Sequence, residues 1–226
     1  PEGIMPELNN DSRRHNGLPR WAERGRFRGF YRYEGPSEMA TSILSGRWDF
    51  RPETLLRRVN YYGDPFIKEL KDLHVNWAAV VWSPGFSHAG DAVQWAMVQE
   101  LIRKLHRCRI KVTTYVSLTN AFWQETFEAE PGLKDCYQRD ANGGPVPYMA
   151  AIYTGVVTRY LMCMNRREWR DYIRYKLDRA LEAGTDSFFF DNIFSRCFCE
   201  VCREKFRDYT RQVYGEAYEM PALLKQ

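Results

Sequence analysis

The sequence lacks any apolar run near the roughly 18 residues that a membrane-spanning helix needs. Its longest such stretch, residues 76–85, is short, so we do not expect a membrane protein. Charge of one sign is also missing, since 33 basic and 29 acidic residues leave a formal net charge of +4. The densest basic stretch, Arg20 to Arg32, is interleaved with aromatic residues and glycine. This pattern is typical of a solvated face and argues against a nucleic-acid partner.

A recognisable signal peptide is absent as well. Residues 1–18 are polar and have no apolar central region. We therefore expect a flexible N-terminal segment over residues 1–18 and one domain over residues 19–226. The hydrophobic content of 44% is enough for a core, and the seven Trp and fourteen Tyr residues offer flat faces that suit either a core or a sugar site.

Short apolar runs alternate with longer helical patterns, which indicates βαβ units around a parallel sheet. The predicted strands cover residues 27–33, 77–82, 110–116 and 187–190. N-capping signals place three helix starts at Asp64, Asp91 and Asn165. A fourth helix follows the last strand and carries on one face Cys202, Phe206, Tyr209 and Val213.

Four βα units are half of the eight that close a barrel. An open doubly wound sheet is the alternative, but no glycine-rich dinucleotide fingerprint follows the first strand, at residues 32–36. We therefore predict an α/β fold of the (β/α)8 TIM-barrel type, truncated after about four βα units. Residues 118–164 lack a long periodic pattern and form a predicted long, functional loop with a turn at residues 142–145.

Cys197, Cys199 and Cys202 lie within six residues, directly after a predicted strand. Zinc prefers four thiolate or imidazole ligands, and such a closely spaced set supplies three of them. Cys163 is the candidate for the fourth ligand and Cys136 a weaker one. The alternatives are buried cysteines without a metal, or a disulfide between two of them. Bound zinc would favour a reducing, cytoplasmic location.

Three features together resemble glycoside hydrolase family 42 β-galactosidases and related uncharacterised barrels. They are the segment 159–165, the strand that ends at Asp191 and Asn192, and the cysteine run followed by Phe206. The resemblance covers about residues 159–215. It implies a glycoside hydrolase of carbohydrate metabolism, with a structural zinc on the metal ligands Cys163, Cys197, Cys199 and Cys202. The family ends this strand with Asn-Glu, the Glu being the acid/base, whereas Ile193 follows Asn192 here. Relatives with an Asp at the strand end are more similar.

Asp191 ends the fourth predicted strand, at the rim where barrel active sites lie. It is the candidate catalytic carboxylate, and a helix N-cap or an ion pair with Arg196 is the structural alternative. Aromatic, amide, imidazole and carboxylate groups at or just after strand ends provide candidate substrate-binding residues. These are Glu34, Trp82, His88, Tyr115, Asn120, Trp123 and Asn192.

Two functions follow from these residues. The first is hydrolysis of a glycoside or oligosaccharide by Asp191 with a second carboxylate, expected beyond Gln226. The second is a barrel that binds carbohydrate without cleaving it, which Ile193 favours. A zinc-stabilised nucleic-acid binder is a weaker third hypothesis, because only Arg196 and Arg203 are close to the cysteines. A homo-oligomer is compatible with the sequence.

Overall fold

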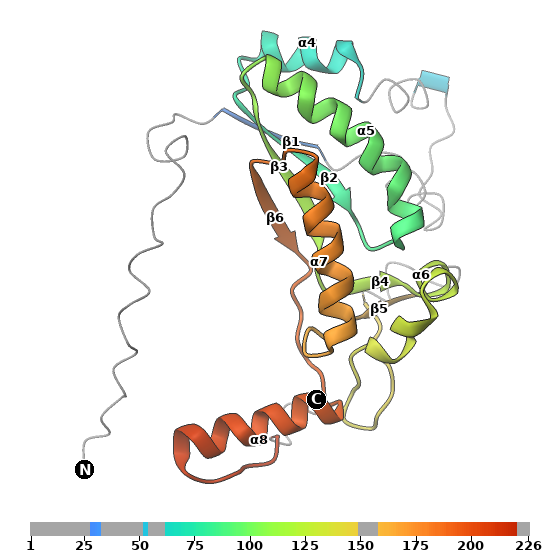
Figure 1. The fold of residues 1–226 in the computed structure, drawn as a ribbon, viewed down its shortest axis with the longest axis vertical. Helices are drawn as coiled ribbons and strands as arrows, with labels where there is room; N and C mark the ends of the chain where they lie inside the picture. Colours follow the sequence, from blue (N-terminus) through green and yellow to red (C-terminus); the bar gives the residue numbers. More distant parts are fainter. Residues whose placement is uncertain (1–27, 33–51, 54–61, 149–157, 221–226) are drawn as a thin grey trace, which may run out of the picture.

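The computed structural model describes residues 28–32, 52–53, 62–148 and 158–220. The predicted N-terminal segment and Glu34 lie outside these ranges. A four-stranded parallel sheet organises the chain, with the strand order β1-β2-β3-β6 (Figure 1). Its strands are Gly29–Arg32, Trp77–Ser83, Lys111–Ser117 and Ser187–Asp191. All four predicted strands are therefore confirmed, with boundaries that differ by at most two residues.

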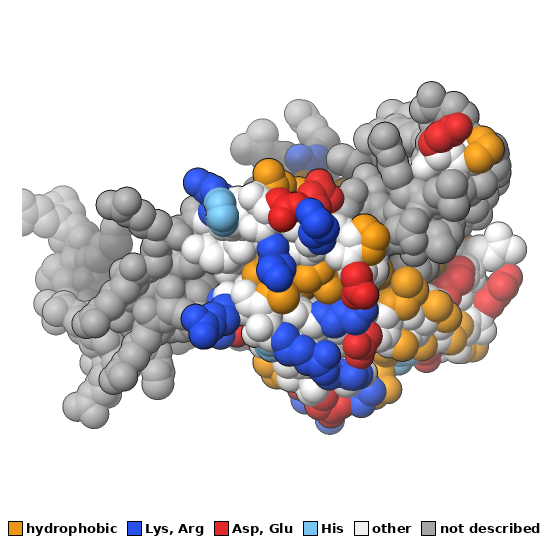
Figure 2. Space-filling view, turned by 90° about the horizontal axis from the view of Figure 1, so that it is seen from above, with side chains coloured by type: hydrophobic (Ala, Val, Ile, Leu, Met, Phe, Trp, Pro, Cys, Tyr) orange, Lys and Arg blue, Asp and Glu red, His pale blue; other side chains and the backbone are white. Residues whose placement is uncertain are grey.

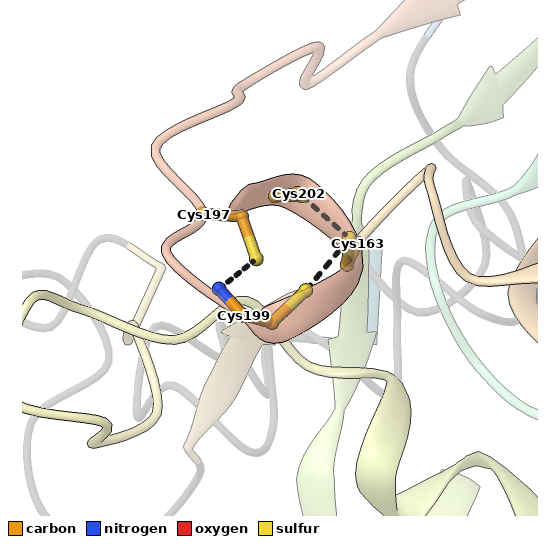
Figure 3. Close-up of side chains that lie close together, drawn as sticks. All are labelled: Cys163, Cys197, Cys199 and Cys202. Carbon is orange, nitrogen blue, oxygen red and sulfur yellow. Dashed lines mark hydrogen bonds between the residues drawn. The ribbon is translucent and has the colours of Figure 1, made fainter. Parts of the chain in front are cut away.

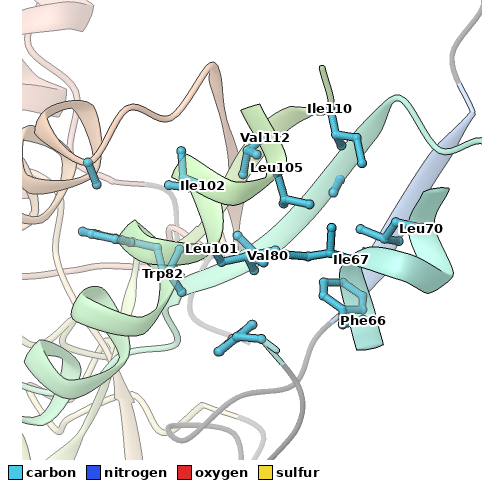
Figure 4. Close-up of a cluster of buried hydrophobic side chains, with 14 of the residues drawn as sticks. Phe66, Ile67, Leu70, Val80, Trp82, Leu101, Ile102, Leu105, Ile110 and Val112 are labelled. Carbon is cyan, nitrogen blue, oxygen red and sulfur yellow. The ribbon is translucent and has the colours of Figure 1, made fainter. Parts of the chain in front are cut away.

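Helices α4 (Asp64–Asp72), α5 (His88–Arg107) and α7 (Arg167–Glu182) contribute to the main hydrophobic core against one face of the sheet. Alternate residues of β2, among them Val80 and Trp82, point at these helices (Figure 4). Leu101, Ile102 and Leu105 of α5 are fully buried against them. Burial of each such side chain contributes about 1.5–3 kcal/mol.

The predicted start of α5 was wrong. The helix begins at His88, and its N-cap is Ser87, whose hydroxyl accepts a 2.9 Å hydrogen bond from the backbone nitrogen of Gly90. Asp91, the predicted N-cap, is fully buried and pairs with Lys176 of α7. A buried carboxylate that has a cationic partner serves tertiary packing rather than capping.

The starts of α4 and α7 also differ slightly from the prediction. Gly63 is the N-cap of α4, so that Asp64 is its first residue. Arg166 is the N-cap of α7, one residue after the predicted Asn165. Shifts of one or two residues are common at helix ends, where capping signals compete.

Residues 118–164 form more than a loop. Strands β4 (Asn120–Phe122) and β5 (Arg159–Leu161) pair antiparallel, and α6 (Trp123–Ala129) and the 3₁₀ helix η2 (Pro131–Cys136) lie between them in sequence. They share a second core with α7. The predicted turn at residues 142–145 is confirmed, because Asp140 accepts hydrogen bonds from the backbone nitrogens of Asn142 and Gly144, both at 2.8 Å.

Helix α8 (Glu200–Tyr214) departs from the expected fourth βα unit. It lies beyond the end of the sheet instead of covering it (Figure 1). Cys202 is buried, but Tyr209 and Val213 of the predicted apolar face are 56% and 46% exposed. The cysteine cluster, rather than the sheet, provides the core for this helix.

The described residues thus form a mixed α/β fold with a parallel sheet whose strands follow one another in sequence order. A doubly wound fold reverses its strand order and places helices on both faces. The arrangement is consistent with part of a (β/α)8 barrel, which has sequential strands and helices on one side. Within the described ranges, no helix is both long and apolar enough to cross a membrane.

Candidate functional site

Four buried cysteines converge beside the first turn of α8 (Figure 3). The sulfurs of Cys163, Cys197, Cys199 and Cys202 all lie within 4.8 Å of one another. Sγ of Cys163 is 3.4 Å from that of Cys202 and 3.8 Å from that of Cys199. The predicted convergence of Cys163 with the CxCxxC run is therefore confirmed, and Cys136 is not part of this group.

Hydrogen bonding among the thiols makes one of them acidic. Hydrogen bonds with the thiols of Cys197 and Cys202 lower the pKa of Cys163 to about 4, and hydrogen bonds with Cys163 and Cys197 raise the pKa of Cys202. The side-chain amide of Asn165 donates a 3.2 Å hydrogen bond to Sγ of Cys202. One thiolate is thus stabilised by its neighbours, whereas further deprotonation requires a cation that offsets the added negative charge.

The donor set fits a tetrahedral metal ion. Four sulfurs at about 2.3 Å from a zinc ion lie roughly 3.8 Å from one another. The sulfur separations of 3.4 and 3.8 Å around Cys163 are close to this value. These four residues could therefore hold a metal ion, with all four ligand positions filled by sulfur.

Gln138 joins the two chain segments that carry these cysteines. Its side-chain nitrogen donates to the carbonyls of Met162, at 3.1 Å, and Phe194, while its side-chain oxygen accepts from the backbone nitrogen of Arg196 at 2.9 Å. Met162 precedes Cys163, and Phe194 and Arg196 precede Cys197. The sequence offered no signal for this role, because a single Gln in an irregular segment has no periodicity.

A second group of polar residues lies at the carboxyl ends of β3 and β6. Ser117 pairs in register with Asp191, and Tyr115 lies on the same face of β3. The hydroxyl of Tyr115 donates a 2.9 Å hydrogen bond to Oδ2 of Asp191, whose Oδ1 accepts a 2.7 Å bond from the backbone nitrogen of Asn192. The carboxylate is half-buried and fixed from both sides.

Asn192 is the centre of this group. It is buried and adopts a left-handed backbone conformation with φ 57°, which Asn tolerates better than most residues. Its amide nitrogen donates to the hydroxyls of Tyr115, at 2.9 Å, and Ser117, at 2.8 Å. Its amide oxygen accepts a hydrogen bond from the hydroxyl of Tyr148. Tyr148 and Ser117 were not predicted, and Tyr148 reaches the group only because the long segment folds back.

Asn120 extends the group toward β4. Its side-chain nitrogen donates to the hydroxyl of Ser117, and its side-chain oxygen accepts from the guanidinium of Arg159 on β5. The guanidinium carbon of Arg159 also lies 4.4 Å from the ring centre of Phe122. The structure therefore brings together four of the predicted residues, which we call the Asp191 cluster: Tyr115, Asn120, Asp191 and Asn192.

The other predicted substrate-binding residues lie elsewhere. Trp82 is 1% exposed in the core on the helix side of the sheet, where it stacks on Trp95. His88 stacks on Tyr172 between α5 and α7, and burial together with Lys176 lowers the pKa of His88 to about 4. Alternation along β2 and the earlier start of α5 therefore place both side chains apart from the Asp191 cluster. Trp123 lines a separate hollow.

Asp91 and Lys176 form a buried ion pair that the sequence did not reveal. Their side chains are 0% and 1% exposed and lie 2.8 Å apart. Lys176 also donates to the hydroxyl of Ser83 at 2.9 Å and to the carbonyl of Phe86. Burial raises the pKa of Asp91 to about 6, although Lys176 opposes the shift. The pair ties α5, α7 and β2 together on the helix side, away from the Asp191 cluster.

Surface charges of both signs are mixed on the face viewed in Figure 2. Ion pairs on the helices and strand ends include Lys68 with Asp72, Lys104 with Asp64, and Lys111 with Asp186. Such paired charges are typical of a solvated surface rather than of a concentrated basic patch.

Comparison with known proteins gives only distant likenesses. No protein-family model and no curated protein matches the chain. The solved structures described below are glycoside hydrolases, and none of these three points to family 42 specifically. The chain spans well under two thirds of the length of each one described below.

The maltogenic α-amylase AmyB of Thermotoga neapolitana gives a TM-score of 0.42 at 14% identity over 68% of this chain and 38% of that chain. The debranching enzyme of Nostoc punctiforme gives 0.40 at 18% identity over 68% and 38%. The glycoside hydrolase domain of PelA from Pseudomonas aeruginosa gives 0.41 at 12% identity over 82% and 51%. Likeness at this level establishes neither a shared active site nor a shared substrate.

Proposed function

We propose that the chain is part of a (β/α)8 barrel of the glycoside-hydrolase type that cleaves a glycosidic bond, with Asp191 as a catalytic carboxylate. One observation carries the proposal: a carboxylate at the carboxyl end of β6, held by Tyr115 and by the backbone of Asn192. Barrel enzymes place their catalytic groups at this end of their strands. Hydrogen-bonding partners that fix a carboxylate also preorganise it for chemistry.

In this proposal Asp191 acts as the nucleophile or as the general acid/base. Hydrolysis of glycosides usually requires two carboxylates on either side of the scissile bond. Glu34, or an acidic residue from another part of such a barrel, would supply the second one. Asn120 and Asn192 offer amide groups that suit sugar hydroxyls once a substrate displaces part of their present hydrogen bonding.

We further propose that Cys163, Cys197, Cys199 and Cys202 bind structural zinc. Zinc in such a site contributes folding energy and has no open position for a substrate. The four residues would hold together β5, the segment after β6 and the first turn of α8. The chemistry of hydrolysis would therefore depend on Asp191 and its partners, not on the metal.

A carbohydrate-binding barrel without catalysis is the second candidate. Ile193, which is 65% exposed, follows Asn192 at the position where the similar β-galactosidases carry their acid/base Glu. In addition, both carboxylate oxygens of Asp191 already accept hydrogen bonds from the protein. Both observations are compatible with a site that binds sugar and leaves it intact.

The Asp191→Asn variant separates the two candidates. We expect it to lower turnover of a responsive aryl glycoside or oligosaccharide by at least about a thousandfold, because it removes the carboxylate. Sugar binding should persist, because the change is nearly isosteric. The measurement is kcat together with binding by calorimetry, in the protein that carries this chain. Asp178→Asn, an exposed change on α7, is the matched control. Near-normal turnover in Asp191→Asn would contradict a catalytic role for Asp191, whereas wild-type protein that binds sugar without turning over any glycoside would support the non-catalytic candidate.

A further inference from the structure

A hollow lies beside α6, at the far end of β4 from Asn120. Its volume is about 650 Å³, within the range of small-molecule sites. Trp123 and Tyr160 supply aromatic walls, while Gln124 and Glu128 supply polar groups. Aromatic faces with nearby amide and carboxylate groups are the chemistry that sugar rings and hydroxyls require.

The aromatic walls of the hollow are held in place. The backbone nitrogen of Trp123 donates a 2.9 Å hydrogen bond to the carbonyl of Thr158, and Ala121 pairs in register with Tyr160. The ring of Trp123 packs at 5.7 Å from that of Phe127 and at 6.0 Å from that of Tyr160. A half-buried Trp supported in this way presents a preorganised face and loses little conformational entropy on binding.

Glu125 and Glu128 differ in their freedom to bind a ligand. Both oxygens of Glu125 accept hydrogen bonds from Ser87, one from its backbone nitrogen at 2.8 Å and one from its hydroxyl. Glu125 is therefore committed to the N-terminus of α5. Glu128 is exposed, and it lies three residues further along α6, on the same side of the helix. Its carboxylate is available to accept hydrogen bonds from sugar hydroxyls.

The charge of the hollow narrows the ligand. Of the ten described residues that line it, two are acidic and none is basic, while the exposed Lys134 places its ammonium group 5.9 Å from the centre of the Trp123 ring. Because the two carboxylates outnumber this one cation, a sugar that carries a carboxylate is disfavoured there relative to an uncharged one. The charge of the hollow therefore favours an uncharged sugar unit as its ligand.

The position of the hollow relates it to the Asp191 cluster. Asn120 begins β4 and joins that cluster through Ser117, and Trp123 directly follows the strand. Three residue steps in an extended strand span about 10 Å. Asn120 and Trp123 are thus separated by more than the width of one sugar ring, so a ligand that contacts both the Asp191 cluster, at Asn120, and Trp123 must be longer than a single sugar.

We propose that this hollow is a distal subsite, in which Trp123 stacks on an uncharged sugar unit of an oligosaccharide whose other end lies at Asp191, while Glu128 binds the hydroxyls of that unit. This inference rests on the proposed function, since it assigns an extended, uncharged oligosaccharide as the ligand. It adds chain-length selectivity to the site.

The test measures binding of malto-, cello- and β-galacto-oligosaccharides of two to six units by calorimetry, with the Asp191→Asn variant to prevent turnover. We expect affinity in one series to rise about tenfold or more between the short and long members. Trp123→Ala should abolish this rise, and Glu128→Ala should reduce it. Tyr209→Ala, which removes an exposed aromatic ring on α8, should leave it unchanged.

The outcomes distinguish this inference from the proposed function. Short sugars that bind without a gain for longer chains, or a gain that survives both Trp123→Ala and Glu128→Ala, would overturn the distal subsite alone. Equal binding of an oligogalacturonide and its uncharged counterpart would overturn the charge argument. If the gain depends on Trp123 while Asp191→Asn retains turnover, the subsite stands and the catalytic role of Asp191 fails. Because Glu128 is exposed, its variant tests the proposal even if Trp123→Ala fails to fold.

Discussion

The hydroxyl of Tyr115 lies 2.9 Å from Oδ2 of Asp191 and from the amide nitrogen of Asn192, donating to the first and accepting from the second. One buried phenol thus fixes two neighbouring groups at the end of β6. Tyr115 faces away from the hydrophobic core that covers the other side of β3, because adjacent residues in a strand point to opposite faces.

Tyr115→Phe removes this hydroxyl and keeps the ring. A hydrogen bond to a charged group contributes about 1.5–3 kcal/mol, so we expect kcat/KM on a responsive glycoside to fall about tenfold to a hundredfold if Asp191 is catalytic. Steady-state kinetics and thermal unfolding measure the two effects. Tyr175→Phe, on the half-exposed face of α7, is the control. Unchanged kinetics in Tyr115→Phe would contradict a functional role for this contact.

Cys202→Ser removes one ligand of the proposed zinc site. Purified wild-type protein should contain about one zinc per chain, and the variant should contain much less because three thiolates hold zinc more weakly than four. Elemental analysis and a lower thermal midpoint check this. Cys108→Ser, which alters a half-buried cysteine outside the cluster, should change neither quantity. Wild-type protein without any bound metal would contradict the proposal.

Gln138→Met tests whether the supporting hydrogen bonds set the spacing of the two cysteine-bearing segments. The change keeps the side-chain volume but leaves the carbonyls of Met162 and Phe194 without this donor. We expect zinc affinity, measured by competition with a chelator, to fall about tenfold. Gln94→Met is a matched control, because Gln94 is also buried and donates to a carbonyl, that of Val81, in the main core. Equal losses in both variants would indicate a general effect on stability.

Lys176→Met should destabilise the fold in a manner that depends on pH. Burial already raises the pKa of Asp91 from 3.8 to about 6. The folded protein therefore binds the carboxyl proton of Asp91 more tightly than the unfolded chain does. The stability that this proton contributes is fully present below about pH 3.8 and is lost as the pH rises through about 6. The ammonium group of Lys176 opposes this rise in the pKa of Asp91. In Lys176→Met the pKa therefore rises further, and the loss of stability extends to higher pH.

We expect Lys176→Met to reduce the free energy of unfolding by about 3–5 kcal/mol at pH 7.5 and by less at pH 5, where Asp91 is protonated. Urea titrations at both pH values measure the difference. Lys68→Met, at an exposed position on α4, should cost little at either pH. An equal loss for Lys176→Met at both pH values would show that packing, not charge, dominates.

Several features could be predicted from sequence because they depend on neighbours in the chain. Short apolar runs rich in aromatic or β-branched residues indicated the four strands, and the CxCxxC spacing brought three thiols together with little loop-closure entropy. The position of Asp191 at a strand end followed from the same local pattern. The turn at residues 142–145 was also predictable, because Asn and Gly favour its backbone conformations.

Other features depend on contacts between distant segments. The run from Ala78 to Trp82 is apolar throughout, so nothing in it indicates which residues face the helices, and Trp82 is in fact part of the core. Tyr148 reaches Asn192 across 44 residues, and Lys176 reaches Asp91 across 85. Periodicity carries no record of such pairs. The sequence by itself therefore determined the strands, the cysteine cluster and the strand-end carboxylate, whereas the tertiary structure alone decided the faces, the buried ion pair and the residues that surround Asp191.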